Sequence, residues 1–143
     1  MSNPEKGMNV LDDIKYKENH QWIKMLDDIT GICGITDFAQ NNLGEITFVE
    51  FINKIVHSEI GDDEKIAIIE SPKNSMDVFS LVSGKVIEIN RSLEDSPELL
   101  NSDPYGDGWI FKIEVEDISM LDDLLEPDEY LETILPDDFL LDE

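Results

Sequence analysis

The chain has 143 residues, of which 34 are Asp or Glu and 10 are Lys or Arg, so its formal net charge at pH 7 is −24. A surface this negative repels nucleic acid and anionic membranes, so both are excluded as ligands. Because 41% of the residues are hydrophobic, the composition predicts one folded domain with a single core. The acidity serves either solubility or the steering of basic partners, and composition does not separate the two.

The N-terminus, the cysteine and the histidines narrow the class of protein. Residues 1–10 lack the apolar core of a signal peptide and the arginines of a transit peptide, and no apolar run approaches a membrane span, so a cytoplasmic protein is expected. The single cysteine, Cys33, excludes an intramolecular disulfide and is expected to be a buried structural thiol. His20 and His57 have no second ligand at zinc spacing, so no metal site is predicted.

Short strand candidates fill the first three quarters of the chain. Apolar runs of strand length occur at residues 22–26, 30–35, 46–51, 66–69, 78–82, 85–89 and 109–115. One helix interrupts them, with Thr36 suited to its N-cap and Gly44 to its end, and a helical turn is expected at 97–100. So many short strands predict a mainly β fold, either a small barrel or a sandwich.

The last quarter of the chain has a different pattern. Apolar pairs recur at helical spacing after Met120, and no lysine or arginine follows Lys112. This pattern predicts two amphipathic helices across 119–135 that pack on the β domain, with 136–143 more loosely attached. A linear binding motif in the acidic tail is the alternative. The predicted organisation is an N-terminal extension at 1–13, a β domain at 14–117 and an acidic helical segment at 118–143.

Lys73 is the residue most suggestive of function. It lies between the apolar runs 66–69 and 78–82, and Pro72 suits the second position of a type I turn, which makes Lys73 the third. The lysine is therefore predicted at the tip of a hairpin, projecting into water, with no other lysine between Lys65 and Lys85. Lysines at solvated turns are common, so this position alone does not establish a function.

A Ser-Gly turn is predicted opposite this hairpin. Gly84 follows Ser83 between two strand candidates, where a tight turn often needs a positive φ. We therefore expect Gly84 to adopt a backbone conformation that other residues avoid.

Short sequence blocks around Lys73 form an ordered series along the chain. They are Lys15-Tyr16, His20-Gln21-Trp22, 34–40, Leu43-Gly44, Phe48-Val49-Glu50, Glu70-Ser71 with Lys73, 82–86, 96–99 with Asn101, and 103–106 with Gly108-Trp109. From about residue 15 to about residue 130, this series resembles the H protein of the glycine cleavage system, a family of small lipoyl carriers.

The resemblance implies a fold and a cofactor. The fold is the lipoyl-type hybrid barrel-sandwich, with a short internal helix and C-terminal helices, so that residues 14–117 form the lipoyl-binding domain. The cofactor is lipoic acid, joined through an amide to Lys73, and Glu70 is then the carboxylate that the lipoate ligase recognises. Such a carrier supplies placement and exposure while the attached group supplies the chemistry, so the chain is expected to be a substrate of enzymes and not an enzyme.

Several residues depart from the family pattern. The residue before the modified lysine is usually apolar and β-branched and is here Pro72, and Asn74 and Ser75 replace two small residues. The family shelters its cargo in a cleft that the resemblance assigns to Asp77 and to a glutamate, and Gln21 stands in place of that glutamate. A carboxylate stabilises a nearby protonated amine, so the neutral Gln21 is expected to weaken this arm cleft.

The resemblance also implies partners. They are a pyridoxal-phosphate glycine decarboxylase, a tetrahydrofolate-dependent aminomethyltransferase, a dihydrolipoamide dehydrogenase, and a lipoate ligase or lipoyl synthase. The chain itself is expected to be a monomer that carries the aminomethyl group of glycine. Two alternatives are an H-like lipoate-binding protein with other cargo, such as sulfur intermediates beside a heterodisulfide-reductase-like complex or a role in stress-linked protein modification, and a lipoate-free acidic interaction domain that kept the fold.

Overall fold

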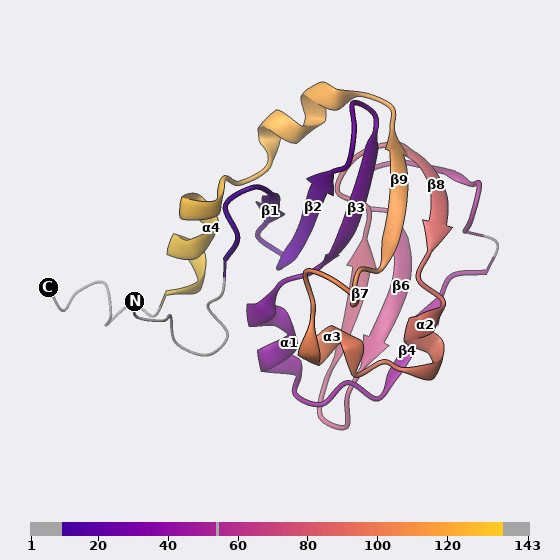
Figure 1. The fold of residues 1–143 in the computed structure, drawn as a ribbon, viewed down its shortest axis with the longest axis vertical. Helices are drawn as coiled ribbons and strands as arrows, with labels where there is room; N and C mark the ends of the chain where they lie inside the picture. The colour runs from indigo at the N-terminus through magenta and orange to yellow at the C-terminus, as the bar shows by residue number, and fades with distance from the viewer. Residues whose placement is uncertain (1–9, 54, 136–143) are drawn as a thin grey trace, which may run out of the picture.

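Two antiparallel sheets form the body of the protein. The computed structural model describes residues 10–53 and 55–135. The larger sheet has the order β1-β2-β3-β9-β8-β5, and the smaller has the order β4-β6-β7. Their bounds are β1 Lys15–Lys17, β2 Gln21–Met25, β3 Thr30–Ile35, β4 Phe48–Phe51, β5 Glu59–Ile60, β6 Lys65–Glu70, β7 Ser75–Phe79, β8 Gly84–Ile89 and β9 Phe111–Val115. The predicted mainly β fold is confirmed, and Figure 1 shows the smaller sheet behind the larger one.

The core lies between the two sheets and is built by alternation along the strands. In β9, Phe111, Ile113 and Val115 are buried while the residues between them are more exposed. In β6, Ala67 and Ile69 are buried on alternate positions, and Ile66 is also buried at an irregularity in the pairing with β7. Because side chains alternate across a strand, each sheet turns one apolar face inward and leaves a more polar face to solvent.

The helices lie at the ends of the sheets. Helix α1, Asp37–Leu43, begins after Thr36, whose hydroxyl accepts a hydrogen bond from the Ala39 N–H at 3.2 Å. It ends at Gly44, whose φ of 79° suits glycine, so both predicted ends are confirmed. The predicted helical turn at 97–100 is shifted, because α3 spans Leu99–Ser102, and the sequence did not predict α2, Ser92–Asp95.

Two helical elements follow β9. The first, η1 at Ile118–Asp123, is a 3-10 helix and not the amphipathic α-helix that the sequence predicted. The second, α4 at Pro127–Ile134, begins with a capping box between Glu126 and Glu129. The predicted segment 136–143 and most of the predicted extension at 1–13 lie outside the described residues.

Aromatic packing holds α4 against the larger sheet. The ring of Tyr130 stacks on that of Tyr16, with ring centroids 4.5 Å apart. The Tyr130 hydroxyl forms hydrogen bonds with Thr36 Oγ1 at 2.7 Å and with His20 Nδ1 at 3.0 Å. Burial raises the pKa of Tyr130 and lowers the pKa of His20, so both groups are neutral at pH 7.

Some predicted strand bounds are wrong. The strand predicted at 78–82 is β7, which runs from Ser75 to Phe79 and stops before Ser80. Buried Ser80 follows β7, where its hydroxyl donates to the Val82 carbonyl and its N–H donates to the Glu64 carbonyl at 2.8 Å, just before β6. The sequence missed β1 and β5, which are too short to show a periodic pattern.

The expectation of a positive φ at Gly84 is also wrong. Among the described glycines, only Gly44 has a positive φ. Gly84 is instead the first residue of β8, and a Cβ built on it would overlap the backbone oxygen of Glu114 on β9. Glycine is required here by the close approach of two strands and not by backbone conformation.

Candidate functional site

Lys73 lies at the tip of the β6–β7 hairpin, as the sequence predicted. The two strands pair from Glu70 opposite Ser75, which leaves four residues, 71–74, in the loop. The Ser71 N–H donates to the Asn74 carbonyl at 2.9 Å, and the Asn74 N–H donates to the Ser71 hydroxyl at 3.2 Å. These bonds close the loop and place Pro72 and Lys73 at its two central positions. The tip lies at the lower end of the molecule in Figure 1.

The amine of Lys73 is accessible. Its side chain is exposed, and the six ion pairs found among residues 10–53 and 55–135 do not include it. By contrast, Lys65 at the start of β6 pairs with Asp77 at 3.5 Å. An acyl group attached to Lys73 therefore displaces no ion pair of the described chain.

The hairpin that carries Lys73 is rigidly held. The inward side chains of Ile66, Ile69 and Val78 are fully buried in the main core. A residue on a tight turn between two such strands has a defined position even though its own side chain is solvated. The structure therefore combines a buried, well-packed base with an exposed amine.

Glu70 and Asp77 lie on the same hairpin as Lys73. Glu70 is the last residue of β6, is exposed, and lies three residues before the lysine. Asp77 lies on the outer face of β7, opposite Ile68, where its carboxylate contacts Lys65. Both carboxylates therefore face solvent on one side of the smaller sheet.

Gln21 lies apart from Lys73 and is fully buried. Its amide Nε2 donates to the Phe79 carbonyl at 2.6 Å, and its Oε1 accepts from the Phe79 N–H at 2.9 Å. These two bonds link β2 of the larger sheet to β7 of the smaller sheet. Phe79 is six residues from Lys73 along the hairpin, or roughly 20 Å in an extended strand.

An open hydrogen-bond acceptor adjoins Gln21. Asn19 donates from Nδ2 to Gln21 Oε1 at 3.1 Å. Its Oδ1 is buried and has no hydrogen-bond partner within the part of the chain that the structure describes. Buried polar atoms are nearly always bonded, so this oxygen is available to a donor. The sequence did not predict this acceptor.

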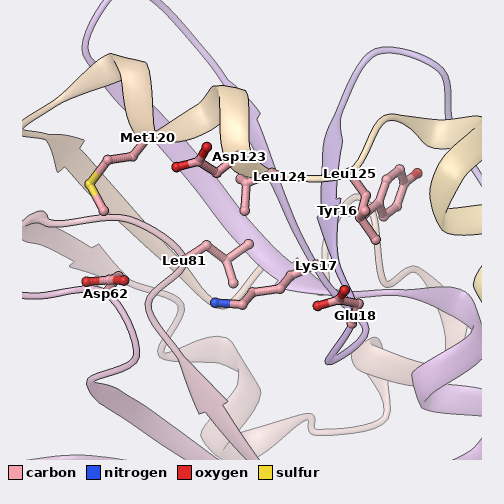
Figure 2. Close-up of a pocket in the computed structure, with 9 residues that line it drawn as sticks. All are labelled: Tyr16, Lys17, Glu18, Asp62, Leu81, Met120, Asp123, Leu124 and Leu125. Carbon is pink, nitrogen blue, oxygen red and sulfur yellow. The ribbon is translucent and has the colours of Figure 1, made fainter.

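A pocket of about 130 Å³ lies near the end of the hairpin remote from Lys73. Figure 2 shows Leu81, Met120 and Leu124 beside one another in it, with Lys17 and acidic side chains around them. Leu81 follows β7 and Asp62 precedes β6, so both belong to the open end of the hairpin. The lining comes from four separate segments, which is why the sequence did not predict it. The tip lysine and this pocket are distinct features.

Cys33 and the remaining expectations can be placed briefly. Cys33 is buried, as predicted, and burial raises the pKa of its thiol. Across residues 10–53 and 55–135, no three His, Cys, Asp or Glu side chains are grouped to hold a metal ion. None of the helices in those residues has the length and apolar character needed to cross a membrane.

Comparison with known proteins gives one consistent family. A family model described as the glycine cleavage H-protein matches residues 14–137. A glycine cleavage system H protein from Coprothermobacter proteolyticus is 49% identical over 127 residues, which cover 89% of this chain and 98% of the relative. One from Coxiella burnetii is 46% identical over 118 residues, covering 82% of this chain and 89% of the relative.

A solved structure agrees with this result. The crystal structure of a glycine cleavage system H protein from Mycobacterium marinum has a TM-score of 0.77 and 28% sequence identity, and the match covers 86% of this chain and 97% of that chain. The match to the family model, the two relatives and this structure all extend over the hairpin that carries Lys73. The chain therefore belongs to the family of glycine cleavage H proteins.

Proposed function

We propose that this chain is the lipoyl carrier of a glycine cleavage system, with lipoic acid attached to Lys73. The observation that carries the proposal is the exposed amine of Lys73 at the tip of a hairpin whose strands are fixed in the core. The relatives compared above are named as H proteins of that system. The alternative of a sulfur cargo has no support from these relatives, whose names all refer to glycine cleavage.

The residues around Lys73 fit an attached lipoyl group. When bound, this group supplies a dithiolane that takes up a group in one active site and passes it on in another. The chain contributes position, since Ser71 and Asn74 close the loop and hold the lysine away from both sheets. Acylation converts the cation to a neutral amide without breaking an ion pair of the described residues. The chain is thus a non-catalytic carrier.

The partners in this proposal are those of the glycine cleavage cycle. The chain receives the aminomethyl group of glycine from a pyridoxal-phosphate decarboxylase and presents it to a tetrahydrofolate-dependent aminomethyltransferase. A dihydrolipoamide dehydrogenase reoxidises the arm, and a lipoate ligase or lipoyl synthase installs it. We propose that all of these reactions occur in the cytoplasm. The strongly acidic surface favours partner enzymes with basic docking faces.

Asp77, Gln21 and Asn19 are proposed to form the cleft for the loaded arm. Along the hairpin, Asp77 lies between Lys73 and Phe79, the residue that Gln21 binds. An arm that folds back from the tip would therefore meet Asp77 first and Gln21 after it. Asp77 offers a carboxylate to a protonated amine, and the unpartnered Oδ1 of Asn19 offers a neutral acceptor. Asn19 is therefore proposed to supply a hydrogen-bond acceptor that partly replaces the glutamate carboxylate for which Gln21 stands.

Lipoylation of the full-length chain by a lipoate ligase tests the proposal. We expect the intact mass to rise by one lipoyl group, and peptide mass spectrometry to locate it on Lys73. Lys73→Arg should abolish the increment. Lys85→Arg is the matched control, because Lys85 is a neighbouring lysine in strand β8 and not on a hairpin tip, and it should be modified like the wild type.

Two outcomes would contradict the proposal. One is a lipoyl increment that persists in Lys73→Arg, which would move the site elsewhere. The other is a folded wild-type chain that the ligase leaves unmodified while it modifies another H protein in the same assay.

A further inference from the structure

The outer face of the smaller sheet carries exposed apolar side chains. Phe48 is 48% exposed, and Ile52, which continues the ladder after β4 by donating to the Ile66 carbonyl at 2.9 Å, is 36% exposed. Alternation along β4 places Phe48, Glu50 and Ile52 on the same face, while Val49 and Phe51 point into the core. Within the described part of the chain, Phe48 and Ile52 are therefore partly open to solvent on this face.

The strand register extends this face toward Lys73. Phe48 lies opposite Glu70, and Glu70 lies opposite Ser75. Directly opposed residues on antiparallel strands have Cβ atoms about 5 Å apart, so the Phe48 ring adjoins the Glu70 side chain. Phe48 thus lies directly across from the residue that precedes the loop holding the lysine.

A second row of residues adds negative charge. Glu50 lies opposite Ile68, and Ile68 lies opposite Asp77. Ile68 is half-buried, while the two acids are exposed. Asp77 is paired with Lys65, whereas Glu50 and Glu70 take part in none of the ion pairs found in the described residues. Apolar and acidic side chains therefore alternate on this face, and Phe48 is flanked by Glu70 across the sheet and by Glu50 along β4.

An unmodified lysine side chain is short, so the enzyme that acylates it must come closer to this face than the other partners. Before acylation, only the lysine side chain extends from the tip, so the enzyme that attaches the lipoyl group has to bring its active site onto the hairpin itself. Enzymes that act on the finished arm work at a greater distance from the strands. A second copy of this chain is a poor occupant, because two surfaces of this charge repel each other.

We propose that the docking surface for the enzyme that attaches lipoate extends beyond Glu70 over the outer face of β4, β6 and β7, with Phe48 as its main apolar contact and Glu50 as a further acidic contact. The occupant is an enzyme surface that presents an apolar hollow flanked by lysine or arginine. A desolvated aromatic residue ringed by polar groups is the usual composition of an interface centre. The inference rests on the proposed function of Lys73 and adds the surface through which that lysine is recognised.

The test measures the rate of lipoylation of the full-length chain by a lipoate ligase at several chain concentrations. Phe48→Thr removes the ring and keeps a side chain suited to a strand. We expect its kcat/KM to fall about tenfold, mainly through a higher KM, as for loss of an interface contact of moderate strength. Phe48→Tyr retains the ring and should stay within about twofold of the wild type.

Ile118→Thr is the matched control. Ile118 is 46% exposed, close to the value for Phe48, but it begins η1 at the opposite, upper end of the molecule in Figure 1. Its kcat/KM should equal that of the wild type. Glu50→Gln provides a second, isosteric probe, with Glu132→Gln on the exposed side of α4 as its control. Only Glu50→Gln should lower kcat/KM and reduce its dependence on salt.

The outcomes separate this inference from the proposed function. Equal kcat/KM for Phe48→Thr and the wild type overturns the docking surface while leaving Lys73 as the site. Equal losses in Phe48→Thr and Ile118→Thr also overturn it, because the effect is then not local. If Phe48→Thr has a lower melting temperature, Glu50→Gln decides, and wild-type kinetics in that variant overturn the inference. A wild-type chain that is not modified at Lys73 instead contradicts the proposed function.

Discussion

At the scale of single residues, Gln21 and Lys73 have opposite environments. Lys73 is exposed at a tip, whereas Gln21 is fully buried and uses both ends of its amide to bind the N–H and the carbonyl of one residue, Phe79. Only a group with a donor and an acceptor can satisfy both atoms of that residue. The amide therefore has a structural role in joining the two sheets, in addition to the cleft proposed above.

Gln21→Glu should destabilise the protein. A carboxylate can accept from the Phe79 N–H but leaves the Phe79 carbonyl without a donor. A buried carbonyl without a hydrogen bond lowers the free energy of unfolding by about 1 to 3 kcal/mol. Burial also raises the pKa of such a carboxyl group, so the protonated form, which restores a donor, is favoured at low pH. A raised pKa in the folded state means that stability is lost as pH rises.

Urea unfolding at several pH values checks this expectation. The variant should unfold at a lower urea concentration than the wild type at pH 7, and the difference should shrink toward pH 5. Gln21→Met is a control, because it also removes the donor to the Phe79 carbonyl but has no titratable group, so its loss of stability should not change between pH 5 and pH 7. A Gln21→Glu protein with wild-type stability at pH 7 would show that the two bonds to Phe79 contribute little.

At the scale of elements, the sequence predicted those helices and strands that a local sequence pattern specifies. The β6–β7 hairpin and its tip were predictable because two apolar runs flank a Pro-containing turn, and α1 was predictable because Thr36 and Gly44 mark its ends. The sequence could not predict β5, which has two residues, or the true role of Gly84, because both depend on pairing with distant strands. The same holds for the Gln21 contact with Phe79, 58 residues away along the chain.

Gly84→Ala should destabilise the β8–β9 pair. The added Cβ would overlap the Glu114 backbone oxygen, and backbone atoms cannot rotate away as a side chain can. Overpacking of this kind costs about 1 to 3 kcal/mol, which lowers the melting temperature by roughly 3 to 10 °C for a domain of this size.

Thermal unfolding followed by circular dichroism measures the effect. Gly61→Ala is the matched control, since a Cβ there would meet only Glu64 Oε1, at 4.0 Å. Its melting temperature should change little. If Gly84→Ala and Gly61→Ala both have the melting temperature of the wild type, β8 and β9 do not approach each other closely at Gly84.

At the scale of the whole molecule, the main features are the negative charge and the exposed Lys73 on its hairpin. The formal charge of −24 favours basic partners, and acylation of Lys73 would make it −25. The sequence was sufficient to predict the family and the hairpin-tip position of Lys73, because both depend on short, contiguous segments. It was not sufficient to predict the outer face of the smaller sheet, because residues from separate segments form that face, and it did not predict the open acceptor on Asn19.

The central claim is that this chain carries the aminomethyl group of glycine on an arm at Lys73. The most direct measurement mixes the fully lipoylated chain with a glycine decarboxylase, pyridoxal phosphate and glycine labelled with carbon-13 at its methylene carbon, and then determines the intact mass. We predict that the labelled carbon and the amino nitrogen of glycine become attached to the wild-type chain and not to Lys73→Arg. A fully lipoylated chain that takes up no label, while a lipoylated H protein from a relative is loaded in the same mixture, would contradict the claim.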